Sequence, residues 1–171
     1  MRTVQQSCKV LALGTLMVAG TAQAQQPLYV GVDLHNWFFN PDRGSAASDV
    51  GVRAKFGARL TPQIALEAHL ATGGSDRTGR DDEIDPGYLL SGLVRGDVPL
   101  SRYSTLYGVV GFSELRFDVN DSSEKESSIS FGLGGDFQVA NNTYLNIDYI
   151  RYISDSDFDY DALNFGARWE F

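Results

Sequence analysis

The sequence predicts an all-β fold, an eight-stranded antiparallel transmembrane β-barrel with up-and-down meander connectivity. Apolar and polar residues alternate with period two from Leu28 onward, as in strands that have one apolar face. Short and long polar connections also alternate along the chain, as they do between the two rims of a barrel. The start of the chain has the form of an export signal, which places the fold outside the cytoplasm.

Residues 1–24 form a candidate signal peptide, ahead of a barrel domain at residues 25–171. Two basic residues precede a short apolar run at residues 10–19, and the small residues Ala22 and Ala24 follow it. We expect cleavage after Ala24. The apolar run is too short for an uncleaved membrane helix, which needs roughly 20 residues.

The composition fits one exported domain that binds no nucleic acid. The chain has 171 residues and a net charge of −8, so a polyanionic partner is disfavoured. Its single cysteine, Cys8, lies within the candidate signal and leaves the mature chain without thiol chemistry. The mean hydropathy of −0.19 is compatible with a membrane barrel, because half of each barrel strand is polar.

The first four strands are predicted at residues 28–39, 50–60, 64–71 and 88–98. The second shows the alternation most clearly, with Val52 and Phe56 on one face and Arg53 and Lys55 on the other. In the fourth, an inward Arg95 also places Leu89 and Leu93 in the interior.

The last four strands are predicted at residues 103–117, 128–139, 143–153 and 163–171. The facing of the fifth stays open, because both of its faces are mainly apolar or small, and a β-bulge there would account for this. The other three alternate cleanly, as Leu145 and Ile147 do with Asn146 and Asp148. All five prolines are expected in connections, because proline cannot donate to a β-ladder; they are Pro27, Pro41, Pro62, Pro86 and Pro99.

Alternation alone does not say which face is wet, and a soluble barrel would turn its apolar face inward. Export and the apolar face on most strands favour a membrane barrel, and so do aromatic residues near both rims, where membrane barrels have girdles. The expected aromatics are Tyr29, Phe137, Tyr144 and Trp169 at the turn end, and Phe38, Tyr88, Phe117 and Tyr149 at the loop end.

The end of the chain carries a family resemblance. Residues 165–171, with Phe165, Trp169 and the final Phe171, resemble the terminal strand of bacterial outer-membrane barrels, which the barrel-assembly machinery recognises. Residues 131–137 and 144–152 resemble the penultimate hairpin of OmpA-like and OmpX-like small barrels in the porin family. The resemblance implies a bacterial outer-membrane location, contact with lipid and lipopolysaccharide, and assembly by that machinery. It implies no activity, because this superfamily includes adhesins, lipid enzymes, channels and structural barrels.

The polar face collects acids and bases in nearly equal number. An eight-stranded barrel is only wide enough for its own side chains, so these charges are expected to pair and plug the lumen. The alternative is a narrow gated channel, which requires a network with two stable arrangements. The predicted lumen charges are Asp33, Arg53, Lys55, Arg59, Glu67, Arg95, Asp97, Asp136, Asp148, Arg168 and Glu170.

Catalysis is not expected. The mature chain has two histidines, His35 and His69, each two residues from an inward acid, and neither forms an evident triad. Lipid A deacylases and palmitoyl transferases share this architecture, but their motifs find no match here.

No metal or cofactor is expected either. Acidic residues alternate from Asp155 to Asp161 and resemble the opening of an EF-hand, but Tyr160 and Gly166 stand where its glycine and bidentate glutamate belong. A second acidic run lies at residues 81–85. Both runs are interpreted as solvated loops, with loose cation bridging to lipopolysaccharide phosphates as the alternative.

The sequence therefore predicts a monomeric, non-enzymatic outer-membrane barrel with a role in envelope integrity or in surface interaction through acidic extracellular loops. Its external ligand is unidentified. The two alternatives are a narrow gated channel for ions or small solutes and a lipid-modifying outer-membrane enzyme.

Overall fold

The computed structural model describes residues 27–41, 47–72, 85–119, 122–154 and 158–171, and it confirms the predicted fold class. None of the described residues forms a helix with the length and apolar character needed to cross a membrane. The strands are β1 (Leu28–Pro41), β2 (Ala47–Arg59), β3 (Ile64–Thr72), β4 (Asp85–Pro99), β5 (Ser104–Val119), β6 (Ser122–Ala140), β7 (Thr143–Ser154) and β8 (Phe158–Glu170).

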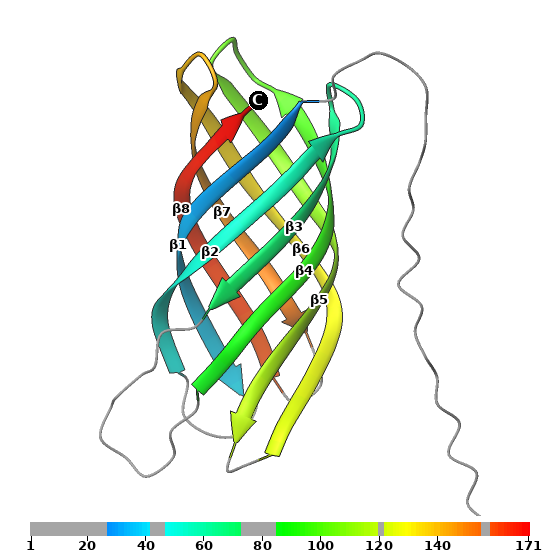
Figure 1. The fold of residues 1–171 in the computed structure, drawn as a ribbon, viewed down its shortest axis with the longest axis vertical. Coiled ribbons are helices and arrows are strands. Elements are labelled where there is room, and N and C mark those ends of the chain that lie inside the picture. The colour runs from blue at the N-terminus through cyan, green and yellow to red at the C-terminus, as the bar shows by residue number, and fades with distance from the viewer. Residues whose placement is uncertain (1–26, 42–46, 73–84, 120–121, 155–157) are drawn as a thin grey trace, which may run out of the picture.

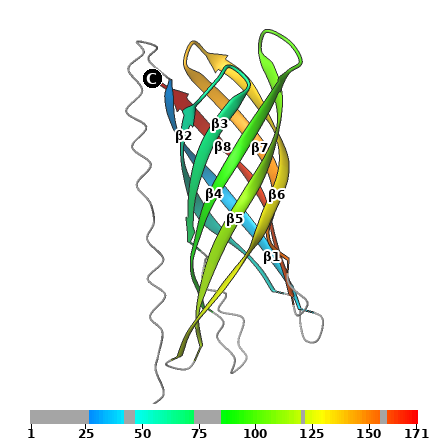
Figure 2. The same ribbon diagram turned by 90° about the vertical axis from the view of Figure 1, so that its right-hand side faces the viewer.

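Each strand pairs antiparallel with the next, and β1 pairs with β8 to close the barrel. Figures 1 and 2 show a tall barrel of strongly tilted strands, with the tight turns and the C-terminus at one end. We call this the turn end and the opposite one the loop end. The turns are closed by backbone hydrogen bonds such as Leu60 N to Ile64 O at 2.8 Å and Leu100 N to Ser104 O at 3.0 Å.

Side chains alternate between lumen and outer surface, as the period-two pattern predicts. In β2, Val52 and Phe56 are exposed outward while Arg53 and Lys55 are buried inside. Leu89 and Leu93 of β4 are buried in the lumen, as expected from an inward Arg95.

The structure also settles the facing of β5. Tyr107 and Val109 point inward, whereas Val110 and Phe112 are exposed, so both faces are apolar at mid-strand. The expected bulge in this strand is wrong, because β5 keeps one register with β6 along its whole length. The irregularity lies in β4, between Pro86 and Tyr88.

Several strands are longer at the loop end than the sequence suggested. β6 begins at Ser122 instead of residue 128, and β8 begins at Phe158 instead of residue 163. The apolar alternation stops before these strands end, but the backbone ladder continues to Ser122 and Phe158.

The placement of all prolines in connections is wrong for three of them. Pro41 and Pro99 are the last residues of β1 and β4, where a missing N–H donor disturbs few ladder bonds. Pro86 lies near the start of β4, beside the register shift. Pro27 and Pro62 lie outside the strands as predicted.

Two of the residues expected in the aromatic girdle are directed toward the lumen instead. Tyr29 is 1% exposed and lies in the lumen, where its hydroxyl donates to Glu67 Oε1 at 2.6 Å. Tyr144 is also directed to the lumen side, near Glu170. The side chain of Phe117 falls outside the described residues. The girdle residues at outward positions are Phe137 and Trp169 at the turn end and Phe38, Tyr88 and Tyr149 at the loop end.

Candidate functional site

The lumen is the candidate functional site, because the barrel brings eight strands of polar side chains together there. All the charges predicted for the lumen occupy inward positions. Arg59 and Glu170, at the turn end, keep partial exposure, and the other nine are buried.

Arg53 occupies the centre of this network. Its Nε donates to Asp33 Oδ2 at 2.7 Å, and its two terminal nitrogens donate to Asp148 at 3.0 and 2.7 Å. Asp148 also accepts from the hydroxyl of Tyr107 at 2.7 Å. Lys55 Nζ lies 3.3 Å from Asp33 Oδ1, which makes the two an ion pair without a hydrogen bond. These buried charges compensate one another.

Arg95 organises a second group nearer the turn end. Its guanidinium donates to Asp97 Oδ1 at 2.7 Å, to Glu67 Oε1 at 3.2 Å and to Asp136 Oδ2 at 2.5 Å. The same guanidinium lies 3.7 Å from the ring centroid of Tyr107, in a cation–π contact. One arginine therefore joins three carboxylates from three strands.

Arg168 and Arg59 close the turn end. Arg168 donates to Glu170 Oε1 at 2.5 Å and to Asp136 Oδ2 at 2.9 Å. Arg59 donates to the same oxygen of Glu170 at 3.0 Å and to Asp97 Oδ2 at 2.5 Å. The ion pairs of Arg95, Arg168 and Arg59 thus form one connected set that reaches the rim at the turn end.

The lumen changes character toward the loop end, where apolar and aromatic side chains replace the charges. Trp37 stacks on Tyr160 with ring centroids 5.9 Å apart and an interplanar angle of 18°. We call the buried apolar and aromatic residues at this end the apolar layer. They are Trp37, Ala71, Leu89, Leu115, Ile150, Tyr152, Ile153, Tyr160 and Ala162.

Both histidines are bonded to side chains of the charged network or of the apolar layer. His69 lies 2.8 Å from Glu67 Oε2 and 3.1 Å from the hydroxyl of Tyr152. His35 lies 2.6 Å from Asn164 Oδ1 and 3.1 Å from the hydroxyl of Tyr160. Each ring nitrogen therefore has a structural partner, and no hydrogen bond joins either histidine to a serine among the described residues.

A separate row of inward serines crosses β4, β5 and β6. Ser113 Oγ donates to Ser91 Oγ at 2.7 Å and lies 2.5 Å from Ser130 Oγ, which donates to Tyr152 O at 2.8 Å. These hydroxyls bond to one another and to a backbone carbonyl, and within the described part of the chain none of them is bonded to a histidine or a carboxylate. In the part of the chain that the structure describes, no group of three or more His, Cys, Asp or Glu residues is arranged to hold a metal ion.

The sequence analysis missed the uncharged members of the network. Tyr107 and Tyr152 bridge the charged groups, and Asn146 and Asn164 donate to Asp33 at 2.9 Å and Asp148 at 2.7 Å. The alternation could have identified them, because it places these four residues on the same inward face as the charges.

Two inward glycines make room for tyrosine rings. A Cβ at Gly57 would overlap the ring of Tyr29, and a Cβ at Gly134 would lie 2.5 Å from Cζ of Tyr107. In each pair the glycine stands directly opposite its tyrosine on the neighbouring strand. The tyrosines therefore lie flat over bare backbone.

The aromatic residues predicted as an assembly signal lie on the outer surface at the end of β8. Phe165, Trp169 and Phe171 are 54%, 40% and 76% exposed. Phe171 N donates to Leu28 O at 2.9 Å, which ties the last residue to the first strand. Ala22 and Ala24 of the predicted cleavage site fall outside the described residues.

A closed antiparallel barrel with an apolar outer face and a charged interior is a membrane-spanning β-barrel protein. A family model for the outer membrane protein beta-barrel domain matches residues 9–171, and the chain belongs to that family. The protein is a bacterial outer-membrane barrel, and its outer face contacts membrane lipid.

Solved structures agree with this fold. Ail, the attachment invasion locus protein of Yersinia pestis, aligns with a TM-score of 0.64 at 16% identity, covering 86% of this chain and 100% of Ail. Neisserial surface protein A aligns with 0.62 at 17% identity, over 84% and 97%. The N-terminal barrel domain of Pseudomonas aeruginosa OprF aligns with 0.55 at 14% identity, over 82% and 97%. No curated protein matches the chain.

Proposed function

We propose that the protein is a closed, non-enzymatic component of the outer membrane that supports envelope integrity and offers its loop end for contact with the exterior. It is exported by residues 1–24, cleaved after Ala24, inserted by the barrel-assembly machinery, and acts as a monomer.

The observation that carries the proposal is the filling of the lumen by two successive layers. Toward the turn end, Arg53 and Arg95 each pair with two or more buried carboxylates, and Arg168 pairs with the buried Asp136 and the partly exposed Glu170. Toward the loop end, the polar side-chain atoms of the apolar layer include the hydroxyls of Tyr152 and Tyr160, which already bond to Arg53, His69 and His35. An ion would have to break the first layer and then cross the second without hydration, so a stable pore is disfavoured.

The test is conductance of the purified, folded mature barrel in a planar lipid bilayer. We expect no conductance, or rare small events. Steady openings of large conductance would contradict the closed lumen and support the gated channel. In cells, deletion of the gene should increase entry of a large hydrophilic antibiotic, and the wild-type gene should restore exclusion. Unchanged permeability would contradict the envelope role.

The surface-contact part of the proposal has its own support at the loop end. β5 and β6 stay paired up to Val119 and Ser122, whereas the pairing of β6 with β7 begins at Phe131. Figure 1 shows these two strands reaching beyond their neighbours. Within the described residues, the β6 backbone from Ser122 to Ser127 therefore has a free edge to which another chain can add a strand.

Charge limits what such a partner can be. One structure of Ail contains the heparin analogue sucrose octasulfate, a polyanion. The present chain has a net charge of −8. Residues 81–84 and 155–157 of its two acidic runs fall outside the described residues, and the interpretation of the second run as a solvated loop is wrong for Asp159 and Asp161, which lie in β8 and pair with Arg151. Long-range electrostatics therefore favours a neutral or basic partner over a sulfated one. Stronger binding of heparin than of a basic protein to intact cells would contradict this part of the proposal.

A further inference from the structure

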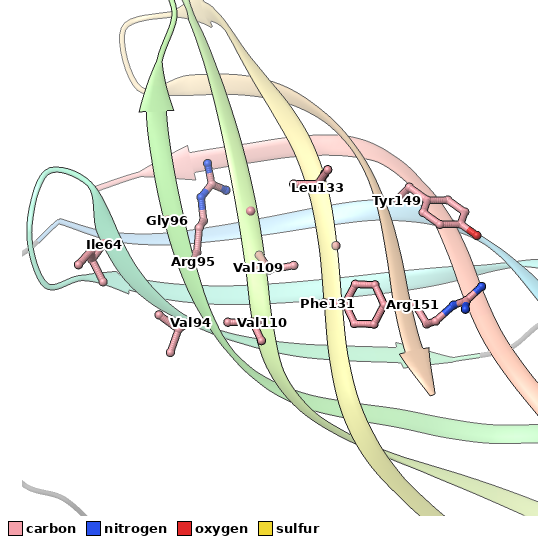
Figure 3. Close-up of a pocket in the computed structure, with 12 residues that line it drawn as sticks. Ile64, Val94, Arg95, Gly96, Val109, Val110, Phe131, Leu133, Tyr149 and Arg151 are labelled. Carbon is pink, nitrogen blue, oxygen red and sulfur yellow. The ribbon is translucent and has the colours of Figure 1, made fainter. Parts of the chain in front are cut away.

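An open furrow crosses the outer surface of the barrel, on the side formed by β3 to β7. It has a volume of about 960 Å³. Figure 3 shows Ile64, Val94, Val110 and Phe131 following one another across four strands, with Tyr149 and Arg151 at the far end. The furrow lies on the face that meets lipid, outside the closed lumen.

The floor of the furrow is bare backbone. Gly96 and Gly108 stand directly opposite each other on β4 and β5. A Cβ at Gly96 would meet no heavy atom within 4 Å, and one at Gly108 would make ordinary contacts with Leu133 Cδ2 at 3.6 Å and Gly132 O at 3.8 Å. The packing of the barrel therefore does not require glycine at either position, unlike at Gly57. Glycine weakens a strand and often marks close approach of a ligand, so the hollow points to an occupant outside the chain.

The polarity of the furrow changes along its length. Ile64 lies at the turn end, and the walls stay apolar until Tyr149 and Arg151. Arg151 faces outward and pairs with Asp161 at 2.7 and 3.0 Å and with Asp159 at 3.2 Å. These charges mark the upper limit of the apolar band. The occupant must be apolar along most of its length and polar at the loop end, which faces the outer leaflet.

The shape of the furrow excludes a rigid partner. Its lining residues come from five of the eight strands, so it follows the curved wall around the barrel. A second barrel is also convex and would touch this wall along one line only. Lipid also removes the hydrophobic driving force for contact between two apolar protein surfaces. A flexible chain can follow the whole path.

We propose that the furrow binds one acyl chain of lipopolysaccharide, with the tail over Gly96 and Gly108 and the head group at the Arg151 end. The site is independent of the closed lumen. It would hold one outer-leaflet lipid longer than its neighbours, at a fixed place on the wall.

The test compares two leucine substitutions on the same strand. Gly96→Leu fills the furrow. Gly92→Leu is the matched control, because Gly92 also stands at an outward position of β4, has no neighbour within 4 Å of a Cβ, and does not line the furrow. Each barrel is extracted from outer membranes in mild detergent, checked for folding by its gel shift on boiling, and examined by native mass spectrometry. Wild type and Gly92→Leu should retain one lipopolysaccharide, and Gly96→Leu should lose it.

A photoreactive residue provides an independent location test in cells. Placed at Val110, in the furrow wall, it should cross-link lipopolysaccharide more than the same residue at Val52, which is outward on β2. Equal retention by Gly96→Leu and wild type, or no retained lipopolysaccharide in wild type, would overturn the proposal. Retention of phospholipid instead, or a cross-linked dimer that Gly96→Leu alone abolishes, would assign the furrow to a different occupant and overturn it too.

Discussion

Both terminal nitrogens of Arg53 on β2 donate hydrogen bonds to the carboxylate of Asp148 on β7, at 3.0 and 2.7 Å. β2 and β7 are not neighbours in the barrel, so this pair spans the lumen. Because Arg53 Nε also donates to Asp33 at 2.7 Å, one buried cation compensates two buried carboxylates. Removal of the cation therefore leaves more uncompensated charge than removal of one acid.

This asymmetry predicts different costs for the two partners. Arg53→Met should lower the free energy of unfolding by about 3–5 kcal/mol, because two carboxylates lose their main cation in a buried site. Asp148→Asn should cost less, since Arg53 keeps Asp33. The measurement is urea denaturation of the refolded barrel in detergent, with Arg102→Met in the exposed β4–β5 turn as control. An equal loss for the two lumen variants would contradict the central role of Arg53.

The apolar layer makes a second prediction. Trp37 is 2% exposed, and its indole Nε1 has no hydrogen-bond partner among the described residues. Trp37→Phe should therefore lose no hydrogen bond and cost less than about 1.5 kcal/mol. Trp37→Ala removes the stacking on Tyr160 and leaves a cavity, with an expected cost of about 3–5 kcal/mol. Denaturation of both variants checks the order, and a larger cost for phenylalanine would show that the indole nitrogen is bonded after all.

The sequence could predict which residues line the lumen only where the strands cross the membrane. Where a strand crosses the membrane, polar residues have one permissible side, and so the alternation placed Arg53, Lys55 and Glu67 in the lumen. It could not pair them. Arg53 and Asp148 are 95 positions apart, and their contact depends on the tilt and register of the whole barrel.

Beyond the membrane, the alternation of apolar and polar residues no longer predicts where a strand begins. Residues 122–128 of β6 are polar on both faces, so nothing in their order distinguishes strand from loop, and backbone pairing with β5 alone extends the strand. Tyr29 shows the same limit at the turn end. An aromatic residue near a rim fits both a girdle and a lumen partner, and Glu67 and Gly57 decide between them in space.

The glycines supply a third prediction with an internal control. Gly57→Ala should lower stability by about 1–3 kcal/mol, because the added methyl group collides with the ring of Tyr29 and disturbs its bond to Glu67. Gly92→Ala meets no neighbour within 4 Å and should leave stability unchanged or raise it by up to about 1 kcal/mol. Urea midpoints of the two variants give the comparison. A greater loss for Gly92→Ala would contradict the packing of Tyr29 over Gly57.

The histidines test whether the barrel is an enzyme. His35 and His69 use their ring nitrogens in buried structural contacts, so replacing both with glutamine should leave lipid A acylation unchanged. Mass spectrometry of lipid A compares cells with the wild-type gene, the double variant and no gene. The level of folded barrel in the membrane is the control. A lipid A species that depends on the two histidines would restore the enzyme alternative.

The final prediction concerns Phe171, which we expect to matter more for assembly than for the stability of the finished barrel. Its side chain is 76% exposed, and its backbone N–H bonds to Leu28 O at 2.9 Å. Full burial of such a ring contributes about 1.5–3 kcal/mol, so an exposed ring in the interface contributes less. Phe171→Ala should therefore change the urea midpoint of refolded protein very little.

In cells the same substitution should sharply reduce the amount of inserted barrel, because the resemblance of residues 165–171 to the outer-membrane terminal strand implies recognition of the aromatic end before β8 pairs with β1. Tyr103→Ala is the matched control, since Tyr103 is an exposed aromatic in a turn at the same end. Quantitative gels of boiled and unboiled outer membranes measure insertion. If Phe171→Ala and Tyr103→Ala reduced insertion equally, or if insertion fell only in proportion to stability, Phe171 would be an interfacial anchor and not an assembly signal.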